Sequence, residues 1–305
     1  TYTGCVATAM AQILNYHKWP EHGKGTHTYR WDAGSRNLTY DFASATFDWN
    51  NMLDTYGSSA TATQRAAVAN LMYACGVSVD MNYGTSASGA ISERVPVGLR
   101  EYFGFDNGVQ MRQRTSYTQE QWETMVYNEL NDNGPVYYAG QAPEGGHAFV
   151  CDGYENGYFH FNWGWSGVSD GYFLLGALNP EDQGIGGYAG GFNSSQRIVT
   201  GLKKPVEGSA LPDPTIVVST PLNAYVSGST ITMTGHYTNG SPFDLKGKVS
   251  IRCYKEGTDE YVASLASRSS INLQPAYYTS TMTFSSASLP EGEYRGYPVF
   301  TPDGS

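Results

Sequence analysis

The pattern of apolar residues changes along the chain of 305 residues, and this change limits the possible folds more than any other feature. Up to residue 133, apolar side chains recur at three- and four-residue steps, which is the period of amphipathic helices. From residue 135 to 204, short aromatic and β-branched runs alternate with Gly, Asn and Asp, a pattern typical of antiparallel strands. Helices followed by strands predict an α+β domain over residues 1–204.

The helices of this domain carry recognisable start and stop signals. One begins at Cys5 and ends before Lys18-Trp19-Pro20, two more are expected near residues 63–75 and 91–102, and residues 21–60 are expected to form a polar, aromatic connection. The fourth, over residues 119–132, begins with a capping box of Thr118 and Gln121 and stops at Gly134-Pro135. Its apolar stripe consists of Trp122, Met125, Val126 and Leu130.

A second domain is expected over residues 214–305, after a polar, proline-containing linker at 205–213. Apolar residues alternate along two of its segments, at Ile231, Met233 and Tyr237 and at Val249, Ile251 and Cys253. Strict alternation with regular turn signals predicts an all-β sandwich, of which the immunoglobulin-like type is the expected form. No constellation of catalytic residues occurs in this domain, so the chemistry is expected in residues 1–204.

Composition excludes several classes of function. The net charge of −10 and the lack of a basic stripe argue against nucleic-acid partners, and no apolar run reaches the ~18 residues of a membrane span. The 24 tyrosines and 36 glycines against 15% charged residues are typical of a β-rich secreted protein. The chain begins without an initiator methionine or signal peptide, so we expect that sequence upstream of Thr1 was removed or is missing.

The four cysteines are too far apart for a disulfide framework or a zinc site. Cys75 lies on the apolar face of an expected helix, and Cys151 continues the apolar run "AFVC", so both are expected in the core. Cys253 belongs to an alternating strand of the second domain. No metal or other cofactor is expected.

Cys5 differs because it lies in the first turn of its helix. Free backbone N–H groups and the positive end of the helix dipole favour a thiolate there, although a buried structural cysteine remains the alternative. His147 follows two glycines at the start of a strand, where an imidazole can project into a cleft. Asn162 and Trp163, in "NWGW", can supply the third group that orients an imidazole, although a structural histidine and a buried aromatic turn are the plainer interpretations.

The stretches "TGCVATAMAQILNYHKWP", "SVDMNYG", "GGHAFVCDGY", "FNWGWSGVSDGYFLLGALNP" and "GGYAGGFN" resemble the streptopain family of secreted bacterial cysteine peptidases, and the additional β domain suggests an interpain-like member. The resemblance covers residues 1–204. It implies a papain-like fold, a Cys5–His147 dyad that forms a thioester acyl-enzyme, and the ring of Trp163 packed on the histidine. It also implies secretion as a zymogen with an inhibitory N-terminal propeptide, and protein or peptide substrates.

The same resemblance places substrate contacts at Ser88, Gly89 and Gly146, to which we add Gln141 and Trp165. In the family a glutamine serves the oxyanion hole, but the ungapped match has Ala139 at that position and Gln141 two residues later. The backbone N–H of Cys5 can still stabilise developing negative charge.

Two other functions use the same residues differently. A thiol acyltransferase, such as a transglutaminase-like enzyme, would employ the same dyad on another acceptor, and an inactive homologue would only bind.

The glycine-rich stretch 182–193 is expected to gate substrate entry. The remaining histidines lack a partner pattern and are expected to be structural or exposed: His17, His22, His27, His160 and His236.

Overall fold

The computed structural model describes residues 2–185, 187, 190–218, 223–285 and 289–303, apart from the side chain of His236. These residues form two compact units, Thr1–Leu211 and Pro212–Ser305. Val206 and Ser209, which the sequence placed in a linker, are hydrogen-bonded to Asp106 and Asn107, so the first unit extends beyond residue 205. None of the described helices combines the length and the apolar character needed to cross a membrane.

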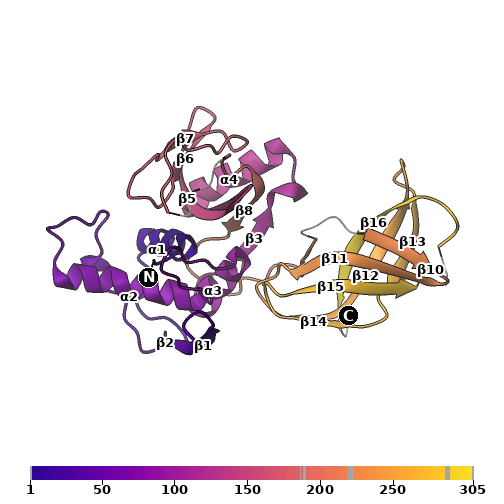
Figure 1. The fold of residues 1–305 in the computed structure, drawn as a ribbon, viewed down its shortest axis with the longest axis horizontal. Coiled ribbons are helices and arrows are strands. Elements are labelled where there is room, and N and C mark those ends of the chain that lie inside the picture. Colours follow the sequence, from indigo (N-terminus) through magenta and orange to yellow (C-terminus); the bar gives the residue numbers. More distant parts are fainter. Residues whose placement is uncertain (1, 186, 188–189, 219–222, 286–288, 304–305) are drawn as a thin grey trace. The chain divides into compact units, whose positions relative to one another are not determined.

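The four expected helices of the first unit are confirmed (Figure 1). The capping box of Thr118 and Gln121 is present, and a second box, formed by Thr61 and Gln64, begins another helix. The expected third helix starts with a 3₁₀ turn. The elements are α1 (Cys5–His17), η1 (Trp49–Asn51), α2 (Ala62–Ser78), η2 (Ser92–Arg94), α3 (Val95–Glu101), η3 (Arg114–Ser116) and α4 (Gln119–Asn133).

An antiparallel sheet of six strands follows, in the order β3-β8-β4-β5-β6-β7. Five of these strands coincide with the aromatic and β-branched runs of the sequence. The short edge strand β3 was not predicted, because its sequence QMRQ is mostly polar and only one of its side chains is buried. The strands are β3 (Gln110–Gln113), β4 (Val136–Ala142), β5 (Gly145–Glu155), β6 (Tyr158–Asn162), β7 (Gly171–Phe173) and β8 (Ser194–Thr200).

The polar, aromatic connection expected over residues 21–60 contains a β-hairpin, which the sequence did not predict. Strands β1 (Thr26–Trp31) and β2 (Arg36–Asp41) pair with each other alone and form a two-stranded sheet. Only Tyr29 and Leu38 of this hairpin are buried. With so few apolar positions, the alternation that reveals a strand in a sequence is too weak to detect.

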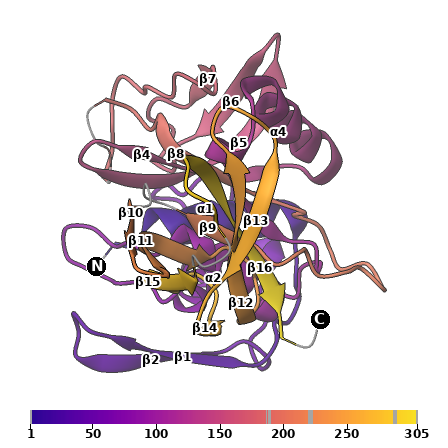
Figure 2. The ribbon, with the colours of Figure 1, turned by 90° about the vertical axis from the view of Figure 1, so that its right-hand side faces the viewer.

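The main sheet separates two hydrophobic clusters, because successive side chains of a strand point to opposite faces. Tyr137 packs in the cluster that contains α1 and α2, while its neighbour Tyr138 packs in the cluster that contains Trp122 of α4. Figures 1 and 2 both show α1 close to the sheet, and the β1–β2 hairpin on the side of the helices that faces away from the sheet. α1 contacts β5, and the backbone amide of Ala148 in β5 reaches the sulfur of Cys5 at the start of the helix.

Every regular element among the described residues of the second unit is a β-strand, as expected, and these strands form two four-stranded sheets. One buried cluster takes Tyr237 and Phe284 from the first sheet and Val249, Ile251 and Cys253 from the second, so the sheets share one core. The first sheet has β9 (Ile216–Val218), β10 (Asn223–Ser227), β11 (Thr230–Asn239) and β15 (Tyr278–Ser285). The second has β12 (Leu245–Lys255), β13 (Tyr261–Ala266), β14 (Ile271–Leu273) and β16 (Tyr294–Pro302).

Candidate active site

Cys5 is the first residue of α1, and glycine is required immediately before it. Gly4 has φ = 89°, and a Cβ atom at this position would lie 2.6 Å from the Sδ of Met81 and 3.1 Å from the carbonyl oxygen of Ser88. No side chain caps the helix. The first amides of α1 therefore remain available beside the half-buried thiol.

Two opposing effects act on the Cys5 thiol. Burial is the larger and raises the pKa, while the backbone N–H groups of Ala148, Val6 and Cys5 lower it by hydrogen bonding to the sulfur. The first of these amides belongs to β5 and the other two to the start of α1. The thiol is thus neutral when considered alone, but it lies where three amides can stabilise a thiolate.

His147, near the start of β5, is buried with 4% of its surface exposed. Its Nε2 lies 2.8 Å from the carbonyl oxygen of Trp163. Because a carbonyl oxygen can only accept, Nε2 carries the hydrogen, and Nδ1 has the free lone pair. Nδ1 is buried without a hydrogen-bond partner. Burial lowers the pKa of the imidazole to about 4, and the bond to Trp163 only partly opposes this shift.

Cys5 and His147 line the same pocket, which has a volume of about 360 Å³. One wall comes from the start of α1 and the segment after α2, and the other comes from β5 and the turn after β6. The pocket is lined by Tyr2, Thr3, Gly4, Cys5, Thr8, Ala9, Gln12, Ala87, Ser88, His147, Ala148, Trp163, Gly164, Trp165, Ser166, Gly184 and Ile185. The structure therefore brings together the helix-start cysteine and the strand-start histidine, which are far apart in sequence.

The orienting partner of His147 is the backbone of Trp163, and the expected role of the Asn162 side chain is corrected. The Oδ1 atom of Asn162 accepts a hydrogen bond from the N–H of Gly164 at 2.9 Å. Trp163 is itself fixed, because its N–H donates to Asp170 and its indole N–H donates to the carbonyl of Ser169. Asp170 was missed in the sequence, where an aspartate in a Gly/Ser-rich turn carries no distinctive signal.

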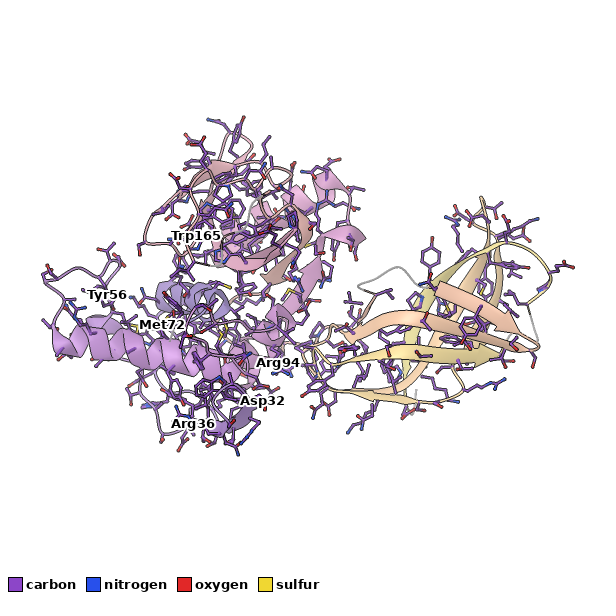
Figure 3. The ribbon with its side chains drawn as sticks, viewed as in Figure 1. Asp32, Arg36, Tyr56, Met72, Arg94 and Trp165 are labelled. Atoms are coloured by element: carbon purple, nitrogen blue, oxygen red, sulfur yellow. The ribbon has the colours of Figure 1, made fainter. Side chains whose placement is uncertain are left out.

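The ring that packs on the histidine is Trp165, which corrects the expectation for Trp163. The rings of His147 and Trp165 are stacked, with centroids 4.7 Å apart and an angle of 16° between their planes (Figure 3 labels Trp165). Trp163 stacks on Trp165, with ring centroids 5.8 Å apart. Trp165 also donates its indole N–H to the carbonyl of Ile185, and a Cβ atom on Gly184 would lie 2.5 Å from the ring.

Of the expected substrate contacts, Ser88 and Trp165 line the pocket. Gly89 is paired through its backbone with Asn82, while Gly146 and Gln141 face each other across β5 and β4; these three are not among the lining residues. Ala139 is buried in the sheet opposite Ala148 and offers no side-chain donor.

The other cysteines and histidines occupy different environments. Cys75 and Cys151 are fully buried in the core as expected, and all four cysteines are free. His27, which was expected to be structural or exposed, is hydrogen-bonded to Asp80 and Tyr102. The side chain of His236, and residues 186 and 188–189 of the expected gate, lie outside the described residues. In the part of the chain that the structure describes, no group of three or more His, Cys, Asp or Glu residues could hold a metal ion.

Comparison with known proteins agrees with this geometry. The peptidase C10 family matches residues 1–173. Streptopain of Streptococcus pyogenes is 44% identical over 208 residues, which are 66% of this chain and 52% of that protein. The thiol protease/hemagglutinin PrtT of Porphyromonas gingivalis is 39% identical over 222 residues, covering 71% of this chain and 26% of that protein.

The solved structure of active wild-type interpain A, a cysteine protease of Prevotella intermedia, is also similar. It shares 41% sequence identity, with a TM-score of 0.60 over 65% of this chain and 82% of that one. The chain spans about half the length of the streptopain sequences that it matches. With a thiol and an imidazole in one pocket and more than half of its residues matched by the family, the chain belongs to the peptidase C10 family.

Proposed function

We propose that this chain is a cysteine endopeptidase that hydrolyses protein substrates with Cys5 as nucleophile and His147 as acid and base. One observation carries the proposal: the thiol of Cys5 and the unpartnered Nδ1 of His147 belong to a single pocket. The free lone pair of Nδ1 is the group that can accept the thiol proton. Membership of a peptidase family and the names of its relatives support this assignment.

The reaction proceeds through a thioester. The Cys5 proton moves to Nδ1 of His147, the sulfur attacks the carbonyl carbon of the scissile bond, and the tetrahedral intermediate collapses as Nδ1–H protonates the leaving amine. Water then attacks the thioester and gives a proton to Nδ1. The C–S bond then breaks, Nδ1 returns its proton to the Cys5 sulfur, and the carboxylic acid product leaves and loses its own proton to solvent, so the enzyme is regenerated unchanged.

Burial explains why the two groups act together. It raises the pKa of Cys5 and lowers that of His147, because each isolated charge is poorly solvated in the pocket. Transfer of one proton creates both charges side by side, and their attraction in a weakly screened site offsets much of this cost. The three amides on the sulfur and the Trp163 carbonyl on Nε2 stabilise the same charged pair.

The oxyanion is stabilised by the backbone N–H of Cys5, at the positive end of α1. Ala139 stands where the family has a glutamine, so a side-chain donor from that position is missing. Ser88 and Trp165 contact substrate within the pocket. Gly89, Gly146 and Gln141 remain proposed contacts for the parts of a substrate that extend beyond it.

The proposal extends to the fold type of each unit and to secretion of the enzyme. The first unit is a papain-like domain, and the second unit is an immunoglobulin-like accessory domain that takes no part in the chemistry. The enzyme is secreted by a bacterium as a zymogen, which the solved fragment of Prevotella intermedia prointerpain A supports by its name. Mass spectrometry of culture medium tests this: a precursor extended upstream of Thr1 should disappear as peptidase activity rises.

The decisive experiment compares the wild-type chain with Cys5→Ala and, as a matched control, Cys75→Ala. We expect Cys5→Ala to abolish hydrolysis of a peptide and labelling by iodoacetamide in the pocket, while Cys75→Ala keeps both in the fraction that folds. Retained hydrolysis in Cys5→Ala would exclude the proposal. Product analysis with an added primary amine separates hydrolysis from acyl transfer, and labelling without turnover would indicate the inactive homologue.

A further inference from the structure

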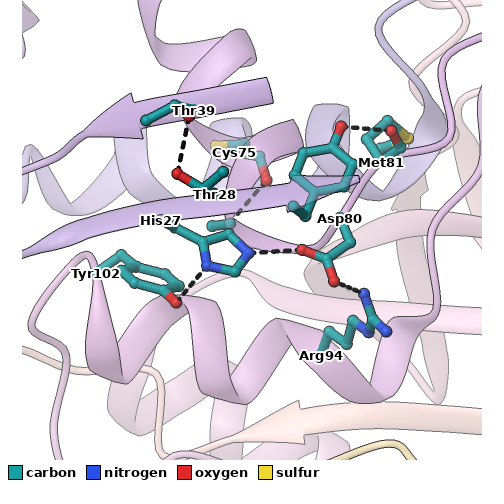
Figure 4. A network of polar contacts seen from close by, with 10 residues as sticks. His27, Thr28, Thr39, Cys75, Asp80, Met81, Arg94 and Tyr102 are labelled. Atoms are coloured by element: carbon teal, nitrogen blue, oxygen red, sulfur yellow. Dashed lines mark hydrogen bonds and ion pairs between the residues drawn. The ribbon is translucent and has the colours of Figure 1, made fainter. Parts of the chain in front are cut away.

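Three side chains on one face of β1 are bonded to the segment that follows α2. The Nε2 atom of His27 lies 2.6 Å from Oδ1 of Asp80, the hydroxyl of Tyr29 donates to the carbonyl of Met81 at 2.6 Å, and the indole N–H of Trp31 donates to the carbonyl of Tyr83 at 3.0 Å. Because alternate residues of a strand share a face, these three side chains form one row. Figure 4 shows the first bond of the row, between His27 and Asp80.

The first bond of this row, between His27 and Asp80, is supported by further contacts of both residues. Asp80 also accepts from the guanidinium of Arg94, and the hydroxyl of Tyr102 is 2.9 Å from Nδ1 of His27 (Figure 4). Asp80 has φ = 54°, a left-handed conformation that only few residue types adopt easily. The chain is thus fixed at the point where it leaves α2 and turns toward the pocket.

The far end of the segment forms part of the pocket wall. Ser88 accepts a hydrogen bond from the N–H of Gly84 at 3.1 Å and donates one to the carbonyl of Tyr2 at 2.6 Å. Asn82 and Gly89 close the loop through two backbone hydrogen bonds. Ala87 and Ser88 then line the pocket that contains Cys5.

The bonds of the loop join its residues to one another and to Tyr2, and the row on β1 joins the start of the segment to a separate strand. Of residues 82–89, none is fully buried and Tyr83 alone packs against the hydrophobic cluster, so the loop has little apolar packing to fix it. A loop of this kind loses conformational entropy when a substrate orders it, and that loss weakens binding. Bonds that hold the loop before the substrate arrives avoid the loss.

We propose that His27, Tyr29 and Trp31 are positioning residues, and that the β1–β2 hairpin is a brace that presets the Ala87–Ser88 wall for an extended peptide. This inference rests on the proposed peptidase function. Figure 3 labels Asp32 and Arg36 on either side of the turn of the hairpin. The brace acts through the loop and touches neither the thiol nor the imidazole, so it governs substrate binding and leaves the chemical step unchanged.

The test uses Tyr29→Phe, which removes one donor and keeps the ring, and Trp31→Phe, which removes one donor and leaves a smaller aromatic ring, together with the double variant. Each full chain is assayed on a peptide with four residues before the scissile bond and on a single-residue ester, which is too short to use the whole wall. We expect each lost bond to raise KM for the peptide about fivefold, with kcat changed less than twofold. The ester should be hydrolysed as by the wild type.

Thr28→Val is the matched control, because Thr28 belongs to the same strand but bonds to Thr39 across the hairpin at 2.8 Å. It should leave KM unchanged. An equal rise of KM in Thr28→Val, an unchanged KM in the folded double variant, or a loss of kcat on both substrates would each overturn the brace.

Hydrogen exchange provides a readout that does not depend on activity. In Cys5→Ala chains carrying the brace variants, the amides of Asn82, Gly84 and Gly89 should exchange at least fivefold faster than in Cys5→Ala alone. Unchanged exchange would contradict the brace even if a variant lost activity through partial unfolding. If wild-type hydrolysis does not depend on Cys5, the proposed function fails; if it does and the brace variants behave as wild type, only the brace fails.

Discussion

The two walls of the pocket are held in different ways. The wall of the imidazole is a stack of rings: His147 lies on Trp165, which lies on Trp163, and all three are buried. The wall of the thiol consists of a helix start and a half-exposed loop, held by single hydrogen bonds to Tyr2 and to β1. The histidine is held by the packing of large apolar rings, and the loop is held by single hydrogen bonds. Loss of one such hydrogen bond costs less free energy than loss of a buried ring.

The largest effect is expected from His147→Gln. Glutamine fills similar space but cannot take up the thiol proton, so kcat/KM should fall by at least about 10³-fold while the fold persists. Steady-state assays and circular dichroism check the two parts. Activity within tenfold of wild type would remove the histidine from the mechanism.

Trp165→Ala should damage the ring-packed wall most. Loss of the large buried ring should lower the free energy of unfolding by about 3 kcal/mol and reduce kcat, because water reaches the His147 ring. Urea unfolding and peptide assays measure both quantities. Trp165→Phe, the control, keeps a ring and should lose less than half as much stability; equal losses would mean that stacking on His147 is unimportant.

The buried histidine also makes stability depend on pH. Its pKa is about 4 in the folded chain and 6.5 ordinarily, so between these values the unfolded chain binds a proton that the folded chain does not. Unfolding free energy should therefore fall as pH drops from 6.5 to 4, by about 3 kcal/mol from this group. Urea midpoints are measured against pH for the wild type and for His147→Gln, and the difference between the two curves gives the contribution of His147. Parallel curves would show that the imidazole is not desolvated.

Asn162→Ala distinguishes the backbone partner from the side-chain partner. Since the carbonyl of Trp163 holds Nε2 and the Asn162 side chain caps only the N–H of Gly164, kcat should fall less than about fivefold. A fall of a hundredfold or more, measured with the same peptide, would restore the asparagine as the orienting group.

The smallest effect is expected from removal of the second unit after Leu211. The cut leaves intact the bonds of Val206 and Ser209 to the first unit. Hydrolysis of a small peptide should change less than twofold, since Cys5 and His147 both belong to the first unit. Thermal unfolding confirms that the truncated chain is folded; a folded but inactive product would assign the second unit a part in catalysis.

The sequence by itself determined the elements that local chemistry encodes. The capping box at Thr118, the helix start at Cys5 and the strand start at His147 were all readable, because dipole, capping and apolar periodicity act over a few residues. The resemblance to a known family joined the last two into a candidate site. The all-β character of the second unit was equally readable from alternation along β11 and β12.

Only the tertiary structure decided which atoms meet. The stacked ring belongs to Trp165 and the orienting oxygen to the backbone of Trp163, although both tryptophans stand in the same short motif. The β1–β2 hairpin escaped notice because its strands bury few side chains and act through polar bonds to a segment some fifty residues away. Such contacts depend on the direction of single donors after the chain has packed, and no periodicity in the sequence records that direction.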